Sequence, residues 1–157
     1  MNRALFLDRD GVINVNHAGY CNRVNDFQLV PGIMSLVRAY RAHGFLPIVV
    51  TNQAGVAHGF MTEADLAEIH QHMLRTFERG DADLHAVYAC TAKEGPDRKP
   101  EPGMLLRAQR EHDIDMGASV LIGDSLTDIQ AGQAAGVGCC IWIPSNTIAK
   151  LQLPRAR

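Results

Sequence analysis

Five short apolar runs recur along the chain, and turn-forming residues separate them from the segments that follow. Each run has the length of a single strand and is bounded by polar residues, glycine or proline. Runs that stay apolar at every position are typical of strands covered on both faces, so Cys139 and Cys140 are expected to be small buried hydrophobic residues. The predicted strands cover residues 4–7, 45–50, 86–89, 120–122 and 139–142.

Helical spacing of apolar residues marks the segments between these strands. The stripes of the first two predicted helices consist of Ile33, Leu36, Val37 and Tyr40, and of Leu66, Ile69, Met73 and Phe77. Thr62 is expected to cap the second helix, with Asp65 at the capping-box position. Pro102 suits the first turn of a third helix. Either Thr127 or Asp128 is expected to open a short fourth helix.

Strands that alternate with helices predict an α/β fold, namely a Rossmann-like parallel sheet flanked by helices on both faces. The chain has 157 residues, 46% hydrophobic and 20% charged, which suits a single domain over residues 1–157. The intervals 10–51 and 53–99 are too short to hold a large cap domain beside their helices. Surface loops are therefore expected to select the substrate, at 14–30, 54–61 and 90–98.

Charge and hydropathy argue against several classes of protein. The formal net charge is −2 and no block of basic residues is present, which argues against a nucleic-acid partner. The longest apolar runs fall far short of the ~20 residues that cross a bilayer, so no membrane association is expected. The start shows no secretion leader, and the four cysteines do not form a disulfide framework pattern. A cytoplasmic protein, with a monomer favoured, is the resulting prediction.

Polar side chains follow three of the predicted strands. In open parallel sheets, ligands bind at the carboxyl ends of the strands. Asp8 and Asp10 follow the first strand, Thr51 and Asn52 follow the second, and Asp124 follows the fourth. Carboxylates this close repel one another unless a cation lies between them, and an oxygen-rich acidic site suits Mg²⁺ with a substrate phosphate. One aspartate after a strand is usually a turn or cap residue, but three such strand ends together favour a catalytic site.

One basic residue and one further acid complete this candidate site. Lys99 offers a point charge to phosphate oxygens, beside the neutral donors of Thr51 and Asn52. Asp128 is open to three interpretations: a helix cap, an acid that holds Lys99, or both. The histidines at 43, 70, 72 and 85 are expected to be surface or hydrogen-bonded residues, because none falls at a paired metal-ligand spacing.

These residues, in this order, resemble the four motifs of the haloacid dehalogenase superfamily of phosphatases. The motifs are an apolar run before Asp8-x-Asp10-Gly11-Val12, an apolar run before Thr51-Asn52, then Lys99, then Gly123-Asp124-x-x-x-Asp128. Longer strings are similar to the D-glycero-D-manno-heptose 1,7-bisphosphate phosphatases and to the related histidinol-phosphate phosphatases, at 7–14, 51–57, 98–100 and 123–132. The segments 55–59 and 62–64 are nearer to the heptose enzymes.

The resemblance implies a phosphatase that works through an aspartyl-phosphate. Asp8 would attack the phosphorus, and Asp10 would protonate the leaving oxygen and later activate water. Mg²⁺ would be held by Asp8, Asp124 and the backbone carbonyl of Asp10. Asp128 would support Lys99 from behind.

The resemblance also implies roles in substrate binding. Thr51, Asn52 and Lys99 would hold the oxygens of the transferred phosphoryl group, so that stabilisation is electrostatic and positional. Gln53 and Arg98 are further candidate substrate-binding residues, and Arg98 could pair with a second phosphate or a sugar hydroxyl. The expected substrate is a small sugar phosphate, with loss of the 7-phosphate of heptose 1,7-bisphosphate. The product would supply nucleotide-activated heptose for lipopolysaccharide or another surface glycan.

Two positions depart from the heptose-enzyme pattern. The zinc loop of those enzymes carries cysteines and a histidine, whereas this chain has Cys90 followed by Ala92, Gly95 and Asp97. One thiol and one carboxylate cannot fill a tetrahedral site, so structural zinc is predicted to be absent. His58 stands where the heptose enzymes have arginine, which bears on the choice of substrate rather than on the reaction.

Three alternatives remain open from the sequence. Another phosphatase of the superfamily would act on histidinol phosphate, an octulosonate phosphate or a nucleic-acid 3′ end, although the missing basic stripe opposes the last of these. A signalling receiver also combines acids, a threonine and a lysine on a parallel sheet. In receivers, however, the lysine follows every aspartate of the site, whereas Asp124 follows Lys99 in this chain. A catalytically silent binding module is the third alternative, which the intact acids oppose.

Overall fold

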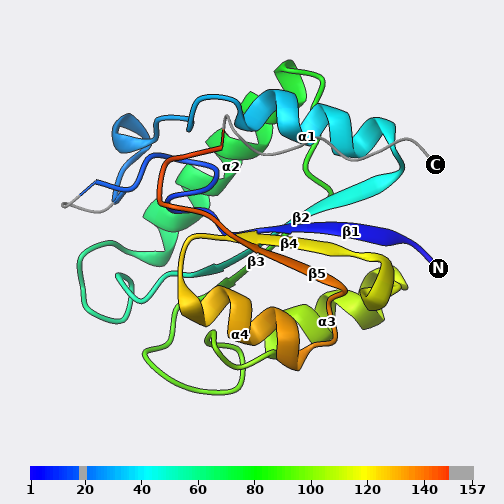
Figure 1. Ribbon diagram of the computed structural model, residues 1–157. Coiled ribbons are helices and arrows are strands. Elements are labelled where there is room, and N and C mark those ends of the chain that lie inside the picture. Colours follow the sequence, from blue (N-terminus) through cyan, green and yellow to red (C-terminus); the bar gives the residue numbers. More distant parts are fainter. Residues whose placement is uncertain (18–20, 149–157) are drawn as a thin grey trace.

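The computed structural model describes residues 1–17 and 21–148, which form a parallel sheet between two layers of helices (Figure 1). The sheet has five strands in the order β3-β2-β1-β4-β5, all parallel. The strands are β1 (Arg3–Leu7), β2 (Phe45–Asn52), β3 (Ala86–Cys90), β4 (Val120–Gly123) and β5 (Cys139–Trp142). The helices are α1 (Ile33–Ala42), α2 (Glu63–Arg79), α3 (Gly103–His112) and α4 (Leu126–Ala134), with 3₁₀ helices η1 (Val24–Asp26) and η2 (Met116–Ala118). The predicted Rossmann-like fold is confirmed, and every predicted strand and helix is present.

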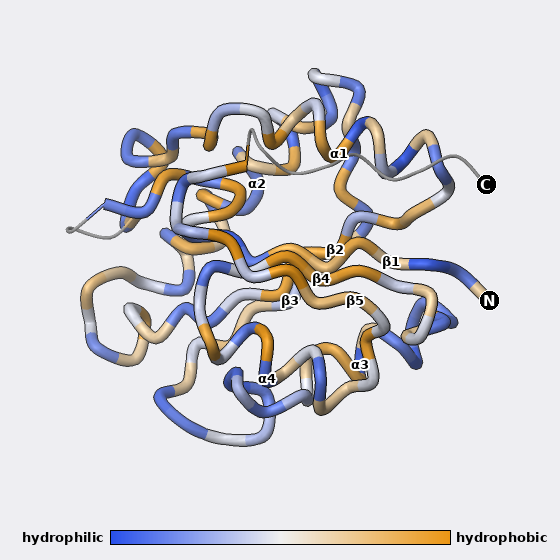
Figure 2. Tube along the Cα trace, viewed as in Figure 1, coloured by the Kyte–Doolittle hydropathy of each residue, from blue (hydrophilic) through white to orange (hydrophobic). Residues whose placement is uncertain are grey.

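The alternation of side chains along β1 divides the interior into two cores, one on each face of the sheet. Leu5 and Leu7 pack with apolar residues of α1 and α2. Ala4 and Phe6 pack on the opposite face with residues of α3 and α4. All four side chains are completely buried, and each large one contributes about 1.5–3 kcal/mol by leaving water. Figure 2 shows the outcome, with hydrophobic strands in the middle layer and hydrophilic segments toward the outside.

The position of β1 in the middle of the sheet places the candidate site. Leu7, the last residue of β1, pairs with Val49 of β2 and with Ile122 of β4. The chain winds from β1 through β2 to β3 in one direction and from β4 to β5 in the other. The residues that follow β1 and β4 therefore emerge side by side, at the kind of topological switch point where open α/β sheets bind ligands. The loops at this edge gather on the left of Figure 1.

Hydrogen bonds at the helix N-termini confirm one predicted cap and correct another. α2 begins in a capping box: Asp65 N donates to Thr62 Oγ1 (3.0 Å), and Thr62 N donates to Asp65 Oδ2 (2.9 Å). The cap of α4 is Ser125, so the prediction that Thr127 or Asp128 opens this helix is wrong. Asp128 lies inside the first turn and accepts a hydrogen bond from Ser125 N there (3.2 Å).

β5 is more exposed than its apolar sequence predicts. It is an edge strand, and Cys139 is exposed, Cys140 is half-buried and Trp142 is 58% exposed. The prediction that both thiols are buried is wrong, because a short apolar run does not distinguish a central strand from an edge strand. The four cysteines are free thiols. Within residues 1–17 and 21–148, no helix combines the length and apolar character needed to cross a membrane.

Candidate active site

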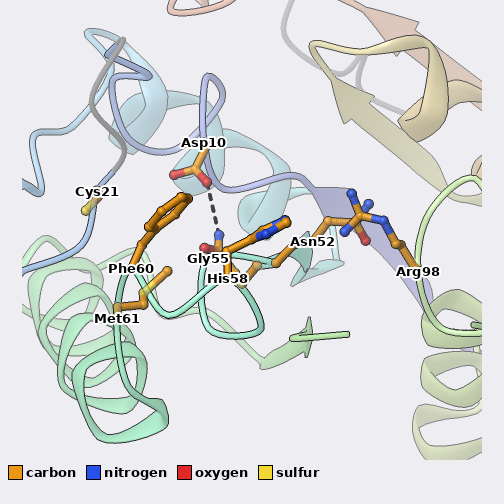
Figure 3. A pocket seen from close by; sticks show the side chains of 10 residues that line it. Asp10, Cys21, Asn52, Gly55, His58, Phe60, Met61 and Arg98 are labelled. Atoms are coloured by element: carbon orange, nitrogen blue, oxygen red, sulfur yellow. Dashed lines mark hydrogen bonds between the residues drawn. The ribbon is translucent and has the colours of Figure 1, made fainter. Parts of the chain in front are cut away.

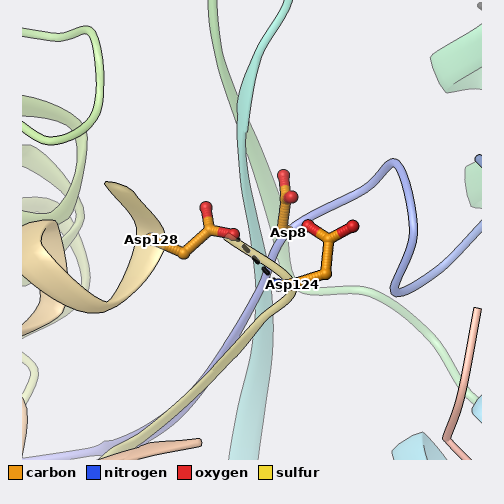
Figure 4. Close-up of side chains that lie close together, drawn as sticks. All are labelled: Asp8, Asp124 and Asp128. Carbon is orange, nitrogen blue, oxygen red and sulfur yellow. Dashed lines mark hydrogen bonds between the residues drawn. The ribbon is translucent and has the colours of Figure 1, made fainter. Parts of the chain in front are cut away.

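Three carboxylates meet at the switch point (Figure 4). Asp8 follows β1, Asp124 follows β4, and Asp128 belongs to the first turn of α4. One oxygen of each lies within 4.8 Å of the other two. The structure thus brings together Asp8 and Asp124 as predicted, in an oxygen-rich group that could hold a hard cation.

The environment of Asp8 disfavours its charged form. Burial raises the pKa of this carboxyl well above its ordinary value and the neighbouring carboxylates raise it further, whereas Lys99 opposes them. Asp8 Oδ1 accepts hydrogen bonds from Lys99 Nζ (3.0 Å) and Arg9 N (2.9 Å). No described residue donates to Oδ2. Asp8 therefore has one oxygen open to a cation or to phosphorus, and added positive charge would favour its ionised form.

Lys99 is 4% exposed, and its ammonium group contacts three acceptors. These are Asp8 Oδ1 (3.0 Å), Val50 O (2.9 Å) and Asp128 Oδ1 (2.5 Å). Burial alone would lower the pKa of Lys99, but the two carboxylates outweigh it and hold the pKa above its ordinary value. Asn52 fixes the backbone of Lys99, since Asn52 Nδ2 donates to Lys99 O and Lys99 N donates to Asn52 Oδ1, both at 3.0 Å. The phosphate contacts predicted for these two side chains stay predictions.

Asp128 holds Lys99, as one interpretation of the sequence predicted, and it completes the capping box of α4 from the first turn, with Ser125 as the cap itself. Its Oδ1 accepts from Lys99, and its Oδ2 accepts from Asp124 N (3.1 Å), Ser125 N (3.2 Å) and Ser125 Oγ (2.9 Å). The side chain is 2% exposed. Because donors occupy both oxygens, Asp128 supports Lys99 and the turn after β4, which leaves Asp8 and Asp124 as the carboxylates most open to a cation.

Asp124 is held from two sides. Ser145, in the loop after β5, donates from Oγ to Asp124 Oδ2 (2.5 Å). Gly11 has a φ of +87° and packs against the same oxygen, so a Cβ at this position would lie 1.9 Å from it. No described residue donates to Asp124 Oδ1. Sequence reasoning missed Ser145, because a lone serine in a loop carries no signal until the fold places it beside an acid.

The Asp10 carboxylate lies outside the group of three acids and is held by other side chains. Its Oδ1 accepts from Arg9 Nη2 (2.9 Å), Arg9 Nε (3.3 Å) and Asn14 Nδ2 (3.0 Å). Its Oδ2 accepts from Gln53 Nε2 (3.0 Å), which also donates to Thr51 Oγ1 (2.9 Å). The amide of Gln53 is thus placed to orient Asp10, and the substrate-binding role of Gln53 stays a prediction.

Arg9 is a second residue that sequence reasoning missed. Its side chain is completely buried, although it carries a charge. Buried charges are uncommon unless they are paired. Its position between the two aspartates of the first motif is the signal that could have found it.

Two adjoining cavities surround these groups. We name the cavity around Asp8, Lys99 and Asp124, of about 200 Å³, the acidic pocket. The other, of about 220 Å³, is named the side pocket (Figure 3). Asp10 and Asn52 line both cavities, so a ligand in one can extend into the other.

The side pocket combines apolar surfaces with polar nitrogen groups. His58 stacks on Phe60 with ring centroids 5.7 Å apart, and Met61 and Cys21 contribute apolar surface. Burial raises the pKa of Cys21 to about 11, so this thiol lines the pocket in its neutral form. Arg98 lies at the other end of the cavity, beyond Asn52 (Figure 3). A polar ligand with a second anionic group would suit this lining.

The loop before Lys99, where the zinc ligands of the heptose enzymes would lie, is ordered by ordinary hydrogen bonds. Arg98 N donates to Gly95 O (3.2 Å), and Gly103 N donates to Pro96 O (2.9 Å). Arg107 pairs with Asp97 at 3.1 Å. These contacts show how the loop holds its shape, and the absence of zinc stays a prediction.

Comparison with known proteins agrees with this geometry. A family model described as HAD-hydrolase-like matches residues 97–147. The D-glycero-alpha-D-manno-heptose-1,7-bisphosphate 7-phosphatase of Burkholderia mallei is 45% identical over 152 residues, which cover 90% of this chain and 80% of the relative. The D-glycero-beta-D-manno-heptose-1,7-bisphosphate 7-phosphatase of Escherichia coli is 41% identical over 145 residues, which cover 86% of this chain and 75% of the relative.

A solved structure matches as well. The D,D-heptose 1,7-bisphosphate phosphatase of B. bronchiseptica, complexed with magnesium and phosphate, aligns with a TM-score of 0.83 at 29% identity, over 88% of this chain and 79% of that one. The fold, the acids at the switch point and these matches define the class: this is a phosphatase of the haloacid dehalogenase superfamily. Within that class, the chain belongs to the D-glycero-D-manno-heptose 1,7-bisphosphate 7-phosphatase family.

Proposed function

We propose that this enzyme removes the 7-phosphate of D-glycero-D-manno-heptose 1,7-bisphosphate, with Mg²⁺, through an aspartyl-phosphate on Asp8. The observation that carries the proposal is the placement of Asp8 between Lys99 and Asp124, with one carboxylate oxygen open. The family relatives named for this substrate support the choice of sugar.

The donor set of the acidic pocket fits Mg²⁺. Asp8 Oδ2 and Asp124 Oδ1 are hard carboxylate oxygens that receive no hydrogen bond from the described residues. The backbone carbonyl of Asp10 would be the third protein ligand, as the family resemblance implies. When bound, Mg²⁺ supplies positive charge that offsets the repulsion between the Asp8 carboxylate and the phosphate.

The chain's own residues account for the transfer of the phosphoryl group. The Asp8 carboxylate attacks phosphorus, and the bond from phosphorus to the sugar oxygen breaks. Asp10 gives its proton to that leaving oxygen and then accepts one from the water that cleaves the acyl phosphate. Inorganic phosphate leaves and Asp8 returns to its starting form.

Thr51 and Gln53 contribute through a directed hydrogen bond. Because Gln53 donates to Thr51 Oγ1, the hydroxyl proton of Thr51 is left to donate to a phosphoryl oxygen. Thr51 is completely buried and lines neither the acidic pocket nor the side pocket, so its contact with the phosphoryl group stays a prediction. A donor held in place typically lowers a barrier by about 2–4 kcal/mol.

The side pocket supports the choice of a bisphosphate. The transferred phosphate occupies the acidic pocket, and the sugar passes Asp10 and Asn52 into the side pocket. Arg98 then meets the remote phosphate, with His58 nearby. Binding energy from this second anion helps to orient the first.

Phosphate release tests the proposal. We expect purified protein with Mg²⁺ to hydrolyse heptose 1,7-bisphosphate faster than histidinol phosphate, the leading alternative substrate. Both anomers of the bisphosphate are assayed, because the relatives include enzymes named for each. Faster turnover of histidinol phosphate would overturn the substrate, and no release from any phosphoester would overturn the reaction.

The receiver alternative is opposed by topology. Receiver-like sheets follow the strand order 2-1-3-4-5. This sheet follows 3-2-1-4-5, and the acid after β4 lies beyond Lys99 in the chain.

Cytoplasmic location, a monomeric state and service to a nucleotide-activated heptose belong to the same proposal. Cell fractionation and size-exclusion chromatography test the first two. Accumulation of heptose bisphosphate in a strain without the enzyme tests the third.

A further inference from the structure

The buried Arg9 guanidinium sets the orientation of Asp10. Two of its nitrogens, Nη2 and Nε, donate to Asp10 Oδ1 at 2.9 and 3.3 Å. Nε also lies 3.1 Å from Asn14 Oδ1, and Asn14 Nδ2 donates to the same Asp10 oxygen. Arg9 is completely buried, so bulk water does not replace a lost partner. Any change in the direction of the guanidinium would therefore move the Asp10 carboxylate.

The remaining guanidinium nitrogen is held from another element of the fold. Arg9 Nη1 lies 3.1 Å from Nε2 of His70, which comes from the middle of α2. Arginine has only donors, so His70 Nε2 must accept through its lone pair, and the ring proton is then on Nδ1. Burial and the charge of Arg9 lower the pKa of His70 to about 4, in agreement with a neutral ring.

The neutrality of His70 matters for the electrostatics of the pair. A carboxylate at this position would compete with Asp10 for the guanidinium charge. A neutral acceptor fixes the direction of Nη1 without carrying a charge of its own. The positive charge of Arg9 then interacts mainly with the Asp10 carboxylate. In the described residues the site thus has a chain of contacts from α2 through His70 and Arg9 to Asp10.

We propose that His70 is a positioning residue for the reaction: through Arg9 it aims the Asp10 carboxylate at the oxygen that leaves phosphorus. The proposal rests on the proposed role of Asp10 as proton donor, but not on the identity of the sugar. Oδ1 of Asp10 accepts from three donor atoms, whereas Oδ2 accepts from Gln53 alone among the described residues, so Oδ2 is the oxygen to carry the transferred proton.

Two aryl phosphates of nearly equal size measure this role directly. Phenolate is a poorer leaving group than p-nitrophenolate, so hydrolysis of phenyl phosphate depends more on proton donation. With Mg²⁺ present, we expect His70→Leu to lower kcat/KM for phenyl phosphate about tenfold more than for p-nitrophenyl phosphate. In His70→Gln the amide oxygen can take the place of Nε2 and accept from Arg9. This variant should therefore recover most of the kcat/KM that His70→Leu loses with phenyl phosphate.

Control measurements separate positioning from simple support of the helix. His72 lies on the same helix, and its ring packs edge-on against Phe27 at 5.5 Å. His72→Gln should leave the ratio of the two kcat/KM values unchanged. Equal losses with both esters in His70→Leu would overturn the proposal, as would a His70→Gln enzyme no better than His70→Leu. Because the sugar substrate is not used, these results do not depend on the choice of heptose.

A spectroscopic measurement on the unmodified enzyme covers the case in which His70→Leu does not fold. Nitrogen-15 NMR of the imidazole distinguishes the two neutral tautomers. We expect His70 to carry its proton on Nδ1 at neutral pH. A proton on Nε2 would overturn the proposal, since that nitrogen could not then accept from Arg9.

Discussion

The acidic pocket and the side pocket share Asp10 and Asn52, yet they are built in opposite ways. In the acidic pocket, Lys99 is 4% exposed and meets three acceptors within 3.0 Å. In the side pocket, His58 is exposed, and the side chain of Arg98 makes one long hydrogen bond among the described residues, to Ala92 O (3.4 Å). The reacting groups are thus fixed by the sheet, whereas the groups that would meet the rest of the substrate lie on loops.

This difference has a physical cause in the fold. Asp8 and Asp124 follow neighbouring strands whose register is fixed by the parallel ladder. His58 and Arg98 belong to surface turns, and such segments can change sequence with little effect on the core. This chain departs from the heptose-enzyme pattern at His58 and in the loop after Cys90. Both departures lie in these turns rather than at the strand ends.

The largest effect is expected from Asp8→Asn, which breaks the acidic pocket alone. The amide cannot form the aspartyl-phosphate, so kcat should fall by at least about a thousandfold. Steady-state phosphate release measures this loss, and circular dichroism checks the fold. The exposed Asp83→Asn is the matched control and should keep full activity. Retained turnover in Asp8→Asn would contradict the assignment of the nucleophile.

Ser145→Ala weakens the acidic pocket without removing a reacting group. Loss of the hydrogen bond to Asp124 Oδ2 frees that carboxylate to rotate, so the Mg²⁺ concentration for half-maximal activity should rise about tenfold. Calorimetric titration of Mg²⁺ into the protein gives the same affinity without substrate. Ser145→Thr keeps the hydroxyl and should bind Mg²⁺ nearly as the unmodified chain does. Unchanged affinity in Ser145→Ala would show that Gly11 packing alone orients Asp124.

Arg98→Ala tests the side pocket alone. We expect KM for heptose bisphosphate to rise several-fold, up to about tenfold, with kcat nearly unchanged, because one charged hydrogen bond is lost remote from the phosphorus. A heptose monophosphate that lacks the remote phosphate should show no such change. Lys93→Ala removes an exposed charge from the same loop and serves as the control. A fall in kcat with constant KM would instead place Arg98 at the reacting phosphate.

The smallest effect concerns the contact of His70 with Arg9, the residue that pairs with Asp10. The pKa of His70 is about 4 in the folded protein and near 6.5 in the unfolded chain. As the pH falls, the unfolded chain therefore takes up a proton on His70 at a higher pH than the folded protein does. Stability is therefore full above pH 6.5 and falls as pH is lowered toward 4. Between pH 6.5 and 5 the loss should be about 1–2 kcal/mol. Thermal melts should show this loss of stability between pH 6.5 and 5 in the unmodified protein and a smaller loss in His70→Gln. The same pH dependence in both proteins would contradict the role of His70 in this loss.

Local patterns predict the fold of this chain because they depend on few distant contacts. The stripe from Ile33 to Tyr40 and the apolar run before Asp8 each report their own element, and both are confirmed. The exposure of Cys139 escaped prediction because the number of neighbours of a strand is a property of the whole sheet. The cap of α4 escaped because Ser125 and Asp128 both suit a cap in isolation.

The candidate site could be predicted only where residues carry their own chemistry. Asp8 and Asp124 stand out by charge and by position after strands, and the structure brings them together. The roles of Arg9, His70 and Ser145 depend on where a helix or a later loop comes to lie beside the first motif. Such partners are settled by tertiary packing, which a linear pattern does not encode.

The close fit of Gly11 against Asp124 ties catalysis to the completion of synthesis. The two residues are far apart in the chain, and Gly11 O also accepts a hydrogen bond from Asn146 N (2.7 Å). A ribosome that has released only the first hundred residues has made the nucleophile but not the carboxylate beside it. Activity in a nascent chain must therefore wait until β4 has emerged and Asp124 lies beside Asp8.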